Sequence, residues 1–577
     1  MYKSIPEVFF ETAKRRKNKA ALLYKKEGVY FPISYRELGH KIKVFGAALQ
    51  KLGAQKGDKI AILSENRPEW AISDLAIMSV GAVTVPLHAT FSARAVVTVL
   101  NHSRAKILIV SNINFLNKVL LGQKYLKHLE KIIVIEKLTS VQRETLSGKV
   151  LSFKALMVLH QPDNFEEIFL DPDEVCTIIY TSGTTGKPKG VILTHRNFLS
   201  NVEAVNEVVP VKENDVFLSF LPLSHVLERM AGYYMPLCYG ATIAYAESLK
   251  QLPQNLREVR PTILISVPRI FEKFHDAVWD KINASRPANR KIFKWALKQR
   301  GNLKCKLADY LVFKKIKNQM GGRLRLAISG GASLNENVAR FFYKIGIKIL
   351  EGYGLTETSP VISVNREGDL KFGTVGKTVP GVKVKIADNK EILVKGPNVT
   401  QGYFDNKKAT KSAFSKDGWF CTGDRGFLDK QGFLTIIGRA KEMLVTSGGK
   451  NVWPEPIENL LNNDKFISQS MVLGNCQKFI SALIVPDWQE IEIYMKANNL
   501  SMEEHEKLTK NQKILEVFQK RLDEKINPNL NDYEKIKKFR LVPQEFSQEN
   551  DELTPTLKLR RHIILQHCKK SIDSMYQ

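Results

Sequence analysis

One short segment of the chain concentrates residues suited to binding phosphate. Between Tyr180 and Val191 the sequence reads YTSGTTGKPKGV, which combines four serine and threonine side chains with three glycines and two lysines. Hydroxyl groups can donate to phosphate oxygens, glycine lets the backbone approach a ligand closely, and lysine supplies positive charge. This phosphate segment is therefore predicted to hold a polyphosphate.

The spacing within the phosphate segment excludes a Walker loop. Only two residues separate Gly183 from Gly186, where that motif needs four, and Pro188 stands where a serine or threonine would bind Mg²⁺. P-loop NTPase chemistry is therefore disfavoured. A solvated turn between a strand and a helix is the plain alternative, but it leaves the crowding of hydroxyls, glycines and lysines unexplained.

Seven further motifs follow the phosphate segment along the chain. They are LPLSHVLER (221–229), SGGASL (329–334), EGYGLTET (351–358), GWFCTGD (418–424), GRAKE (438–442), SGGKNV (447–452) and LTPTLKLRR (553–561). In this order they resemble the adenylate-forming (AMP-binding) superfamily of acyl-CoA synthetases, luciferases and peptide-synthetase adenylation domains. The resemblance spans nearly the whole chain.

The EGYGLTET motif also has a chemical interpretation of its own. Gly352 and Gly354 permit a tight backbone against a purine, and Glu357 offers a hard carboxylate oxygen of the kind that Mg²⁺ prefers. A Rossmann fingerprint is excluded because it would need a third glycine where Glu357 stands.

The resemblance assigns roles to individual residues. It implies that Tyr353 stacks near adenine, that Thr356 contacts the α-phosphate as a catalytic group, and that Glu357 holds the metal together with Thr181. His225 would orient the substrate carboxylate or gate the entry of a thiol, although a lone histidine is often structural. The expected ATP contacts in these loops are Thr181, Ser182, Gly183, Thr184, Thr185, Gly186, Lys187, Gly352, Tyr353, Gly354 and Thr356, and the acyl and adenine pocket adds Gly330, Gly331 and Ala332.

Three charged residues nearer the C-terminus suit a nucleotide and a reacting carboxylate. Asp424 can accept hydrogen bonds from both ribose hydroxyls, and Arg439 can donate to the sugar or the phosphate, with a surface ion pair as the alternative. The resemblance implies that Lys558 swings into the site as a catalytic residue and neutralises charge between the carboxylate and the α-phosphate. Leu557 replaces the glycine that commonly precedes this lysine.

The two half-reactions implied by the resemblance need different groups at one site. A rotating C-terminal domain would supply them, with a hinge at 438–441 and Lys441 where many relatives have aspartate. Gly448 and Gly449 would line a pantetheine channel, because glycine leaves the backbone room for the ligand.

The composition places these motifs in a large globular protein. The chain has 577 residues, of which 44% are hydrophobic and 25% charged, so disordered, collagen-like and coiled-coil classes are disfavoured. The formal net charge of +28 favours anionic partners. Six scattered cysteines without a CxxC pair, and a first thirty residues that do not read as a signal peptide, favour a reducing, cytoplasmic location.

Local patterns predict the elements that carry the motifs. A helix is expected over 34–53, strands at 59–63, 83–87, 106–110, 177–180, 262–265 and 324–328, and helices over 68–80 and 92–101. Uncharged stretches at 75–93 and 230–246 are broken by glycine and proline and are interpreted as core. The alternation predicts an α/β fold: a large N-terminal domain of doubly wound parallel sheets (1–437) with a β-rich subdomain (about 373–437), and a small mobile α+β C-terminal domain (442–577).

Residues 281–325 form a strongly basic segment. Fourteen lysines and arginines stand there against Asp309, with apolar residues interleaved at helical spacing. Basic amphipathic helices suit an anionic lipid surface or an acidic partner, and a solvated helical hairpin is the alternative. The segment is similar to the insertion of long-chain acyl-CoA synthetases.

The sequence thus predicts a long-chain fatty acid–CoA ligase. It would use ATP, Mg²⁺ and coenzyme A, form an acyl-AMP and pyrophosphate, and then transfer the acyl group to a thiol with release of AMP. Alternatives are an acyl-ACP ligase that uses an acidic carrier protein, an activator of aryl or amino acids, and a lipid- or nucleic-acid-binding protein on a degenerate synthetase scaffold. A nucleic acid partner is not expected, whereas peripheral attachment to the inner face of a membrane is compatible with the basic segment.

Overall fold

The computed structural model describes residues 4–138, 149–181, 188–299, 302–501, 503–547, 549–554 and 558–577. The predictions for Ser182, Gly183, Thr184, Thr185, Gly186 and Lys187 lie outside the described residues. The chain divides into two compact units, of which unit 1 comprises 1–385, 393–421 and 429–434, and unit 2 comprises 386–392, 422–428 and 435–577.

The first sheet of unit 1 has strands in the order β19-β9-β8-β4-β3-β5-β6-β7. From β8 to β7 the neighbours run parallel, whereas β9 and β19 add antiparallel pairs at one edge. The strands predicted at 59–63 and 83–87 are confirmed. The bounds are β3 (Lys59–Leu63), β4 (Val83–Leu87), β5 (Ile107–Val110), β6 (Lys131–Val134), β7 (Val150–Ser152), β8 (Val175–Thr181), β9 (Lys189–Thr194) and β19 (Gly402–Tyr403).

The second sheet of unit 1 has the order β16-β15-β14-β13-β12-β10-β11-β1-β2. Its strands from β14 to β1 pair in parallel, and β15, β16 and β2 pair antiparallel at the two edges. The bounds are β1 (Ala20–Lys26), β2 (Val29–Ser34), β10 (Val216–Ser219), β11 (Thr242–Tyr245), β12 (Ile263–Ser266), β13 (Leu326–Ser329), β14 (Ile349–Gly354), β15 (Val361–Val364) and β16 (Lys377–Thr378).

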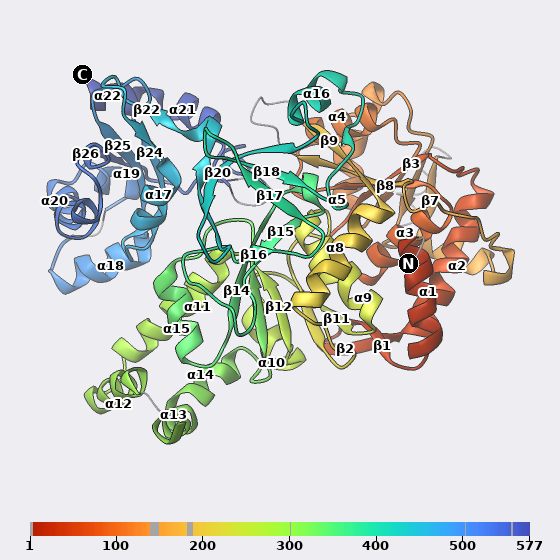
Figure 1. The fold of residues 1–577 in the computed structure, drawn as a ribbon, viewed down its shortest axis with the longest axis horizontal. Helices are drawn as coiled ribbons and strands as arrows, with labels where there is room; N and C mark the ends of the chain where they lie inside the picture. The colour runs from red at the N-terminus through yellow and green to blue at the C-terminus, as the bar shows by residue number, and fades with distance from the viewer. Residues whose placement is uncertain are drawn as a thin grey trace. The chain divides into compact units, whose positions relative to one another are not determined.

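Helices connect and cover these strands, as the predicted α/β alternation requires (Figure 1). The predicted capping box at Ser34 and Glu37 is confirmed at the start of α2. The main helices are α1 (Ile5–Arg16), α2 (Tyr35–Lys51), α3 (Pro68–Ser79), α4 (Ala93–Ser103), α5 (Ile113–Leu120), α7 (Phe153–Leu159), α8 (His195–Val208), α9 (Met235–Tyr239), α10 (Leu252–Val259), α11 (Pro268–Asn283), α12 (Pro287–Lys298), α13 (Asn302–Ala308), α14 (Lys314–Gln319), α15 (Glu336–Lys344) and α16 (Lys407–Ala413). Shorter turns are η1 (Gln123–Tyr125), η2 (Pro162–Asn164) and η5 (Thr356–Thr358), and η3 (Glu228–Tyr234) and η4 (Asp309–Phe313) are π-helices.

Each sheet of unit 1 has its own apolar core. One core gathers Leu63, Val85, Leu108 and Ile178 from the first sheet, and the other gathers Leu264 and Ala327 from the second. The uncharged stretches at 75–93 and 230–246 supply α3, β4, η3, α9 and β11, which are largely buried, so their interpretation as core is confirmed. None of the helices in the described ranges is long and apolar enough to cross a membrane.

Short strands follow residue 373, as predicted. Four of them, β17 (Lys383–Ile386), β18 (Glu391–Lys395), β20 (Phe420–Leu428) and β21 (Leu434–Arg439), form a sheet in the order β17-β18-β20-β21. The division between the two units runs through this sheet, because residues 386–392 and 422–428 belong to unit 2.

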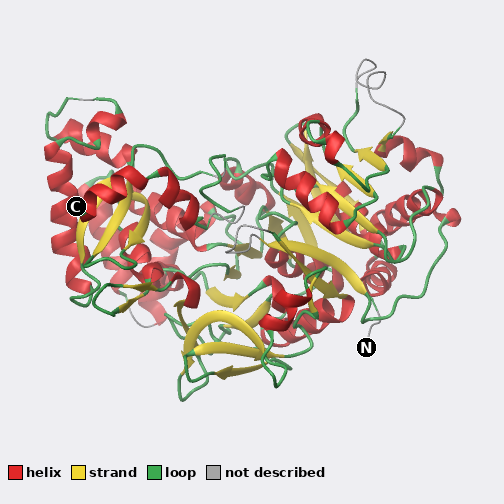
Figure 2. Cartoon of the chain, turned by 90° about the horizontal axis from the view of Figure 1, so that it is seen from above, coloured by secondary structure: helices red, strands yellow, loops and turns green. Residues whose placement is uncertain are grey.

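Unit 2 has an α+β organisation around the sheet β24-β25-β26, which is flanked by helices in Figure 2. Apolar residues such as Val472, Ile484, Ile491 and Phe518 form its core. The bounds are η6 (Ala440–Glu442), β22 (Leu444–Val445), β23 (Asn451–Val452), α17 (Pro454–Asn462), β24 (Ile467–Leu473), β25 (Ile480–Pro486), α18 (Trp488–Ala497), α19 (His505–Leu508), α20 (Gln512–Arg521), η7 (Leu522–Ile526), η8 (Asn527–Asn529), β26 (Ile536–Leu541), α21 (Arg561–His567) and α22 (Lys569–Tyr576).

Candidate active site

Three predicted loops of unit 1 meet where β12, β13 and β14 end. The backbone N–H of Gly330, directly after β13, donates to Ser266 O at the end of β12 at 3.1 Å. A Cβ atom placed on Gly330 would lie 3.1 Å from Leu227 Cδ2 and 3.8 Å from Gly352 O. The structure therefore brings together the SGGASL, EGYGLTET and LPLSHVLER motifs, as expected for loops at the carboxyl ends of parallel strands.

The glycines of these loops are required for different reasons. Gly331 has a φ of +87°, a conformation that side chains disfavour, and Ala332 follows it in the same loop. At Gly354 a Cβ atom would stand 1.7 Å from Pro360 O, whereas at Gly352 the nearest atom would be 3.5 Å away. Gly354 is thus needed for the turn between β14 and β15. This structural requirement explains the glycine independently of the expected contact with a purine.

Glu351 buries a carboxyl group beside the same loops. Its Oε2 accepts the backbone N–H of Leu334 at 3.3 Å. Burial raises the pKa of Glu351 to about 7, because loss of water disfavours the charged form. The sequence analysis did not select Glu351 as a site residue. Its acidic side chain at the start of the EGYGLTET motif was the signal that could have identified it.

Glu357 is fixed by partners from a distant part of the chain. It lies in η5, the short helical turn that also carries Thr356, immediately after the strand that contains Tyr353. Tyr403 donates its hydroxyl hydrogen to Glu357 Oε1 at 2.8 Å, and the backbone N–H of Thr400 donates to Glu357 O at 2.8 Å. Sequence analysis missed Tyr403, because nothing near it marks a contact with Glu357.

Thr181 is linked to Glu357 through two intermediate residues. Thr181 ends β8 opposite Lys189 of β9, and Lys189 Nζ lies 5.1 Å from the centre of the Tyr403 ring. Tyr403 also pairs with Val191 in the β19–β9 ladder. The hydroxyl of Thr181 and the cation of Lys189, both within the phosphate segment, are therefore connected to the carboxylate of Glu357.

This donor set fits a Mg²⁺ ion that is held mainly by phosphate oxygens. The described ranges contain no group of three or more histidine, cysteine or acidic residues that could hold a metal unaided. Mg²⁺ commonly uses one or two carboxylates together with substrate phosphates, and Glu357 with the Thr181 hydroxyl matches that requirement.

His225 lies beside a second histidine that sequence analysis missed. His225 Nδ1 accepts the backbone N–H of Leu227 at 3.3 Å, which assigns the ring hydrogen to Nε2. The neighbouring Ser224 Oγ lies 2.7 Å from His88 Nδ1. Burial, with a smaller contribution from His225, lowers the pKa of His88 to about 3, so His88 is a neutral imidazole at neutral pH.

A buried ion pair anchors the segment that presents His225. Arg229 pairs with Asp74 of α3, and both side chains are fully buried. Arg229 also donates to Thr177 Oγ1 at 2.7 Å and to Tyr234 OH at 2.8 Å. Because Thr177 lies on β8, this network joins the histidine segment to the strand that leads into the phosphate segment.

In unit 2, Asp424 and Arg439 lie on adjacent strands and form an ion pair, which was the alternative to the predicted nucleotide clamp. Arg439 Nε lies 3.2 Å from Asp424 Oδ1, and the Asp424 side chain is only 6% exposed. Thr422 Oγ1 accepts the backbone N–H of Asp424 at 3.1 Å and donates to Ile392 O at 2.7 Å. Arg439 is 39% exposed, so the pair lies at the surface on its arginine side, and the nucleotide role of both residues stays a prediction.

Lys558 belongs to the same charged group of unit 2. The Thr554 hydroxyl accepts the backbone N–H of Lys558 at 3.0 Å, and Thr554 N donates to Lys558 O at 2.8 Å. The residue as a whole keeps much exposed surface. Desolvation first, and then repulsion from Arg439, lower the pKa of Lys558, while Asp424 acts in the opposite direction.

The proposed hinge and channel residues follow β21. Lys441 lies in the turn η6, just after Gly438, where a Cβ atom would meet the Trp453 ring at 3.1 Å. Gly449 has a φ of +73° and Gly448 does not have a left-handed backbone. A Cβ atom on Gly449 would meet no described atom within 4 Å, so the left-handed backbone, and not crowding, favours glycine there.

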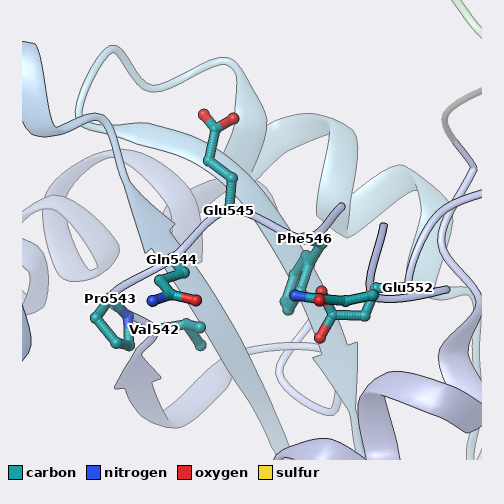
Figure 3. A pocket seen from close by; sticks show the side chains of 7 residues that line it. Val542, Pro543, Gln544, Glu545, Phe546 and Glu552 are labelled. Carbon is teal, nitrogen blue, oxygen red and sulfur yellow. The ribbon is translucent and has the colours of Figure 1, made fainter. Parts of the chain in front are cut away.

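A pocket elsewhere in unit 2 contributes none of the predicted site residues (Figure 3). It has a volume of about 130 Å³ and is lined by Val542, Pro543, Gln544, Glu545, Phe546, Asn550 and Glu552. Ligand pockets are typically about 300–1,000 Å³, so this pocket is too small for a nucleotide.

Comparison with known proteins identifies the family. Residues 9–404 match the family described as AMP-binding enzyme, and residues 441–577 match the AMP-binding enzyme C-terminal domain. The long-chain-fatty-acid–CoA ligase FadD15 of Mycobacterium bovis is 35% identical over 95% of this chain and 93% of its own. The fatty acyl-CoA synthetase A of Dictyostelium discoideum is 31% identical over 96% of this chain and 86% of its own.

Solved structures show the same fold. The adenylation domain of a carboxylate reductase from Mycobacterium chelonae matches with a TM-score of 0.82 and 20% identity, over 99% of this chain and 91% of that one. The anthranilate CoA ligase AuaEII, in complex with anthranoyl-AMP, matches with a TM-score of 0.76 and 21% identity, over 99% and 98%. This chain therefore belongs to the AMP-binding enzyme family of adenylate-forming proteins, in the branch that contains the long-chain fatty acyl-CoA ligases.

Proposed function

We propose that the protein ligates a long-chain fatty acid to coenzyme A in two steps. A fatty carboxylate attacks the α-phosphate of ATP, which gives an acyl-AMP and releases pyrophosphate. The sulfur of CoA then attacks the acyl carbon, a carbon–sulfur bond forms, and AMP leaves. Two relatives named as fatty acyl ligases or synthetases, each matched over nearly the whole chain, support this substrate class.

The observation that carries the proposal is the fixed carboxylate at Glu357. Tyr403 orients the Glu357 side chain and Thr400 holds the Glu357 backbone. The carboxylate is therefore positioned to bind a cation that accompanies ATP. Glu357 and Thr181 would hold Mg²⁺, which neutralises phosphate charge when bound. Tyr353, Gly352, Gly354, Gly330, Gly331 and Ala332 would line the adenine and acyl pocket beside them.

The other site residues have separate roles in the first step. Asp424 would accept the ribose hydroxyls, and Arg439 would donate to the sugar or the phosphate. Lys558 would neutralise charge that develops between the carboxylate and the α-phosphate, and Thr356 would bind the same phosphate. His225, with a hydrogen on Nε2, could donate to the carboxylate of the fatty acid.

The second step needs a route for the thiol. We place the domain hinge at 438–441, with Lys441 as a pivot, between the N-terminal domain (1–437) and the C-terminal domain (442–577). The pantetheine arm would pass Gly448 and Gly449, where the lack of side chains and the open space next to Gly449 favour a narrow ligand.

Pyrophosphate exchange tests the first step and its substrate class. The protein is incubated with ATP, labelled pyrophosphate and carboxylic acids of rising chain length, and exchange should increase from short to long fatty acids. Maximal exchange with an aryl or amino acid, or none with any acid, would overturn the proposal. The second outcome would favour a binding protein on a degenerate synthetase scaffold.

Release of AMP with different acceptors tests the second step. Coenzyme A should release AMP and give a thioester, whereas an acidic acyl carrier protein should not. The carrier is the second candidate acceptor because the formal net charge of +28 suits an acidic protein. AMP release with the carrier alone would move the function to acyl-ACP ligation. An anionic membrane surface is the other partner that this charge suits.

A further inference from the structure

The basic segment 281–325 folds into helices that share one buried side. Phe293 and Ala296 of α12 lie in the same core as Ala308 and Phe313 of the following helical stretch. The predicted helical character of this segment is confirmed by α12, α13, η4 and α14. In Figure 1, α12 and α13 lie next to each other at the edge of the ribbon.

The opposite side of these helices exposes large apolar side chains. The helical spacing of α12 places Trp295 opposite the side that Phe293 and Ala296 bury. Five large apolar side chains of the segment are between 38% and 69% exposed, namely Ile292, Trp295, Leu307, Tyr310 and Leu311. Single exposed apolar residues are common on protein surfaces. Five of them within twenty residues instead indicate an interaction surface.

Exposed cations are interleaved with these apolar side chains along the segment. The exposed lysines of the described part of this surface are Lys291, Lys294, Lys298, Lys304, Lys306, Lys314 and Lys315. Asp309, the one acidic residue of the segment, is already paired with Lys317 at 2.5 Å. The positive charge of this surface is therefore left to attract an external anion.

We propose that this apolar and basic surface binds an anionic lipid bilayer at its interface. A bilayer interface accepts aromatic and aliphatic side chains among its acyl chains, with lysines at the level of the headgroups. None of the residues assigned to the ligase site belongs to this surface, and its binding is measured without ATP or CoA.

Vesicle sedimentation tests the charged component. Vesicles of phosphatidylserine and phosphatidylcholine are compared with vesicles of phosphatidylcholine alone, and only the anionic ones should bind the protein. The triple variant Lys291→Gln, Lys294→Gln and Lys298→Gln should bind about 10- to 100-fold more weakly at low salt. The matched control removes three exposed lysines from α16, at Lys407, Lys408 and Lys411, and should bind nearly as the parent does.

A second variant tests the apolar component. Trp295→Ala with Leu311→Ala keeps every charge and should weaken binding even at high salt, where charge attraction is screened. Both variants should retain activity with a soluble short acid, which shows that they fold. Equal weakening by the α16 control, or unchanged vesicle binding in both variants, would overturn the proposal. If vesicle binding persists and only turnover with an acidic carrier protein falls, the surface docks a protein instead.

Discussion

The hydroxyl of Tyr403 donates to Glu357 Oε1 at 2.8 Å across 46 residues of chain. Tyr403 comes from the edge of the first sheet, whereas Glu357 follows β14 of the second. The bond therefore ties a carboxylate of the second sheet to the strand that flanks the phosphate segment. Together with the bond from Thr400 N–H to Glu357 O, it joins the two halves of the proposed Mg²⁺ and ATP site.

Removing this hydroxyl should weaken the use of Mg²⁺. Tyr403→Phe keeps the ring beside Lys189 but leaves Glu357 without its donor, so the carboxylate is oriented less well. We expect the Mg²⁺ concentration for half-maximal adenylation to rise by about 2- to 30-fold, the effect of a hydrogen bond worth about 0.5–2 kcal/mol. Pyrophosphate exchange titrated with Mg²⁺ measures it. Tyr343→Phe, at an exposed tyrosine of α15, is the matched control, and an equal rise in both variants would contradict the assignment.

Lys558 should serve the first half-reaction only. Lys558→Ala removes the cation expected to neutralise charge during adenylation, so acyl-AMP formation should fall about 100- to 1,000-fold. Thioester formation from supplied acyl-AMP should stay within a few-fold of the parent. The two half-reactions are assayed separately by pyrophosphate exchange and by CoA consumption. Equal losses in both, or a similar loss in the exposed control Lys570→Ala, would refute this division.

The channel is best tested at Gly448. A bulky residue at Gly449 would also strain a backbone with a φ of +73°, whereas Gly448 does not have a left-handed backbone. Gly448→Val should leave pyrophosphate exchange intact and reduce thioester formation by at least about tenfold, because a side chain there would obstruct the thiol arm. A normal thioester yield from the valine variant would argue against the channel.

Glu228 should make unit 1 less stable as the pH rises. Its side chain is fully buried next to Gly232, and burial raises its pKa from the ordinary 4.5 to about 8, with Ser219 acting in the opposite direction. A raised pKa favours the protonated folded form, so the contribution is complete below pH 4.5 and is lost as the pH rises through about 8.

Glu228→Gln removes this titration. Relative to the parent, the variant should gain stability between pH 5 and pH 9 by about 2–4 kcal/mol in the free energy of unfolding. Urea unfolding at both pH values measures the difference, with Glu207→Gln on the exposed side of α8 as the control. A difference from the parent that does not change with pH would show that Glu228 is not protonated in the folded protein.

The sequence determined the elements and the family. Strands β3 and β4 and the capped start of α2 were predicted because hydrophobic periodicity and capping are local properties of the chain. The eight motifs that identify the family could also be recognised from the sequence, because each one is a short continuous run of residues. By contrast, α1 and the hairpin of β1 and β2 were missed. Pro32 inside β2 disfavours the prediction of a strand, although both strands are mainly apolar.

The tertiary structure alone decided which side chains share a site. Tyr403 with Glu357, His88 with Ser224 and Asp74 with Arg229 are pairs that no local pattern connects. The same holds for the exposure of Trp295, since the spacing of apolar residues in α12 marks an amphipathic helix but not which of them remain outside. Periodicity is set by neighbours along the chain, whereas these contacts and exposures arise only when sheets and helices from distant segments pack together.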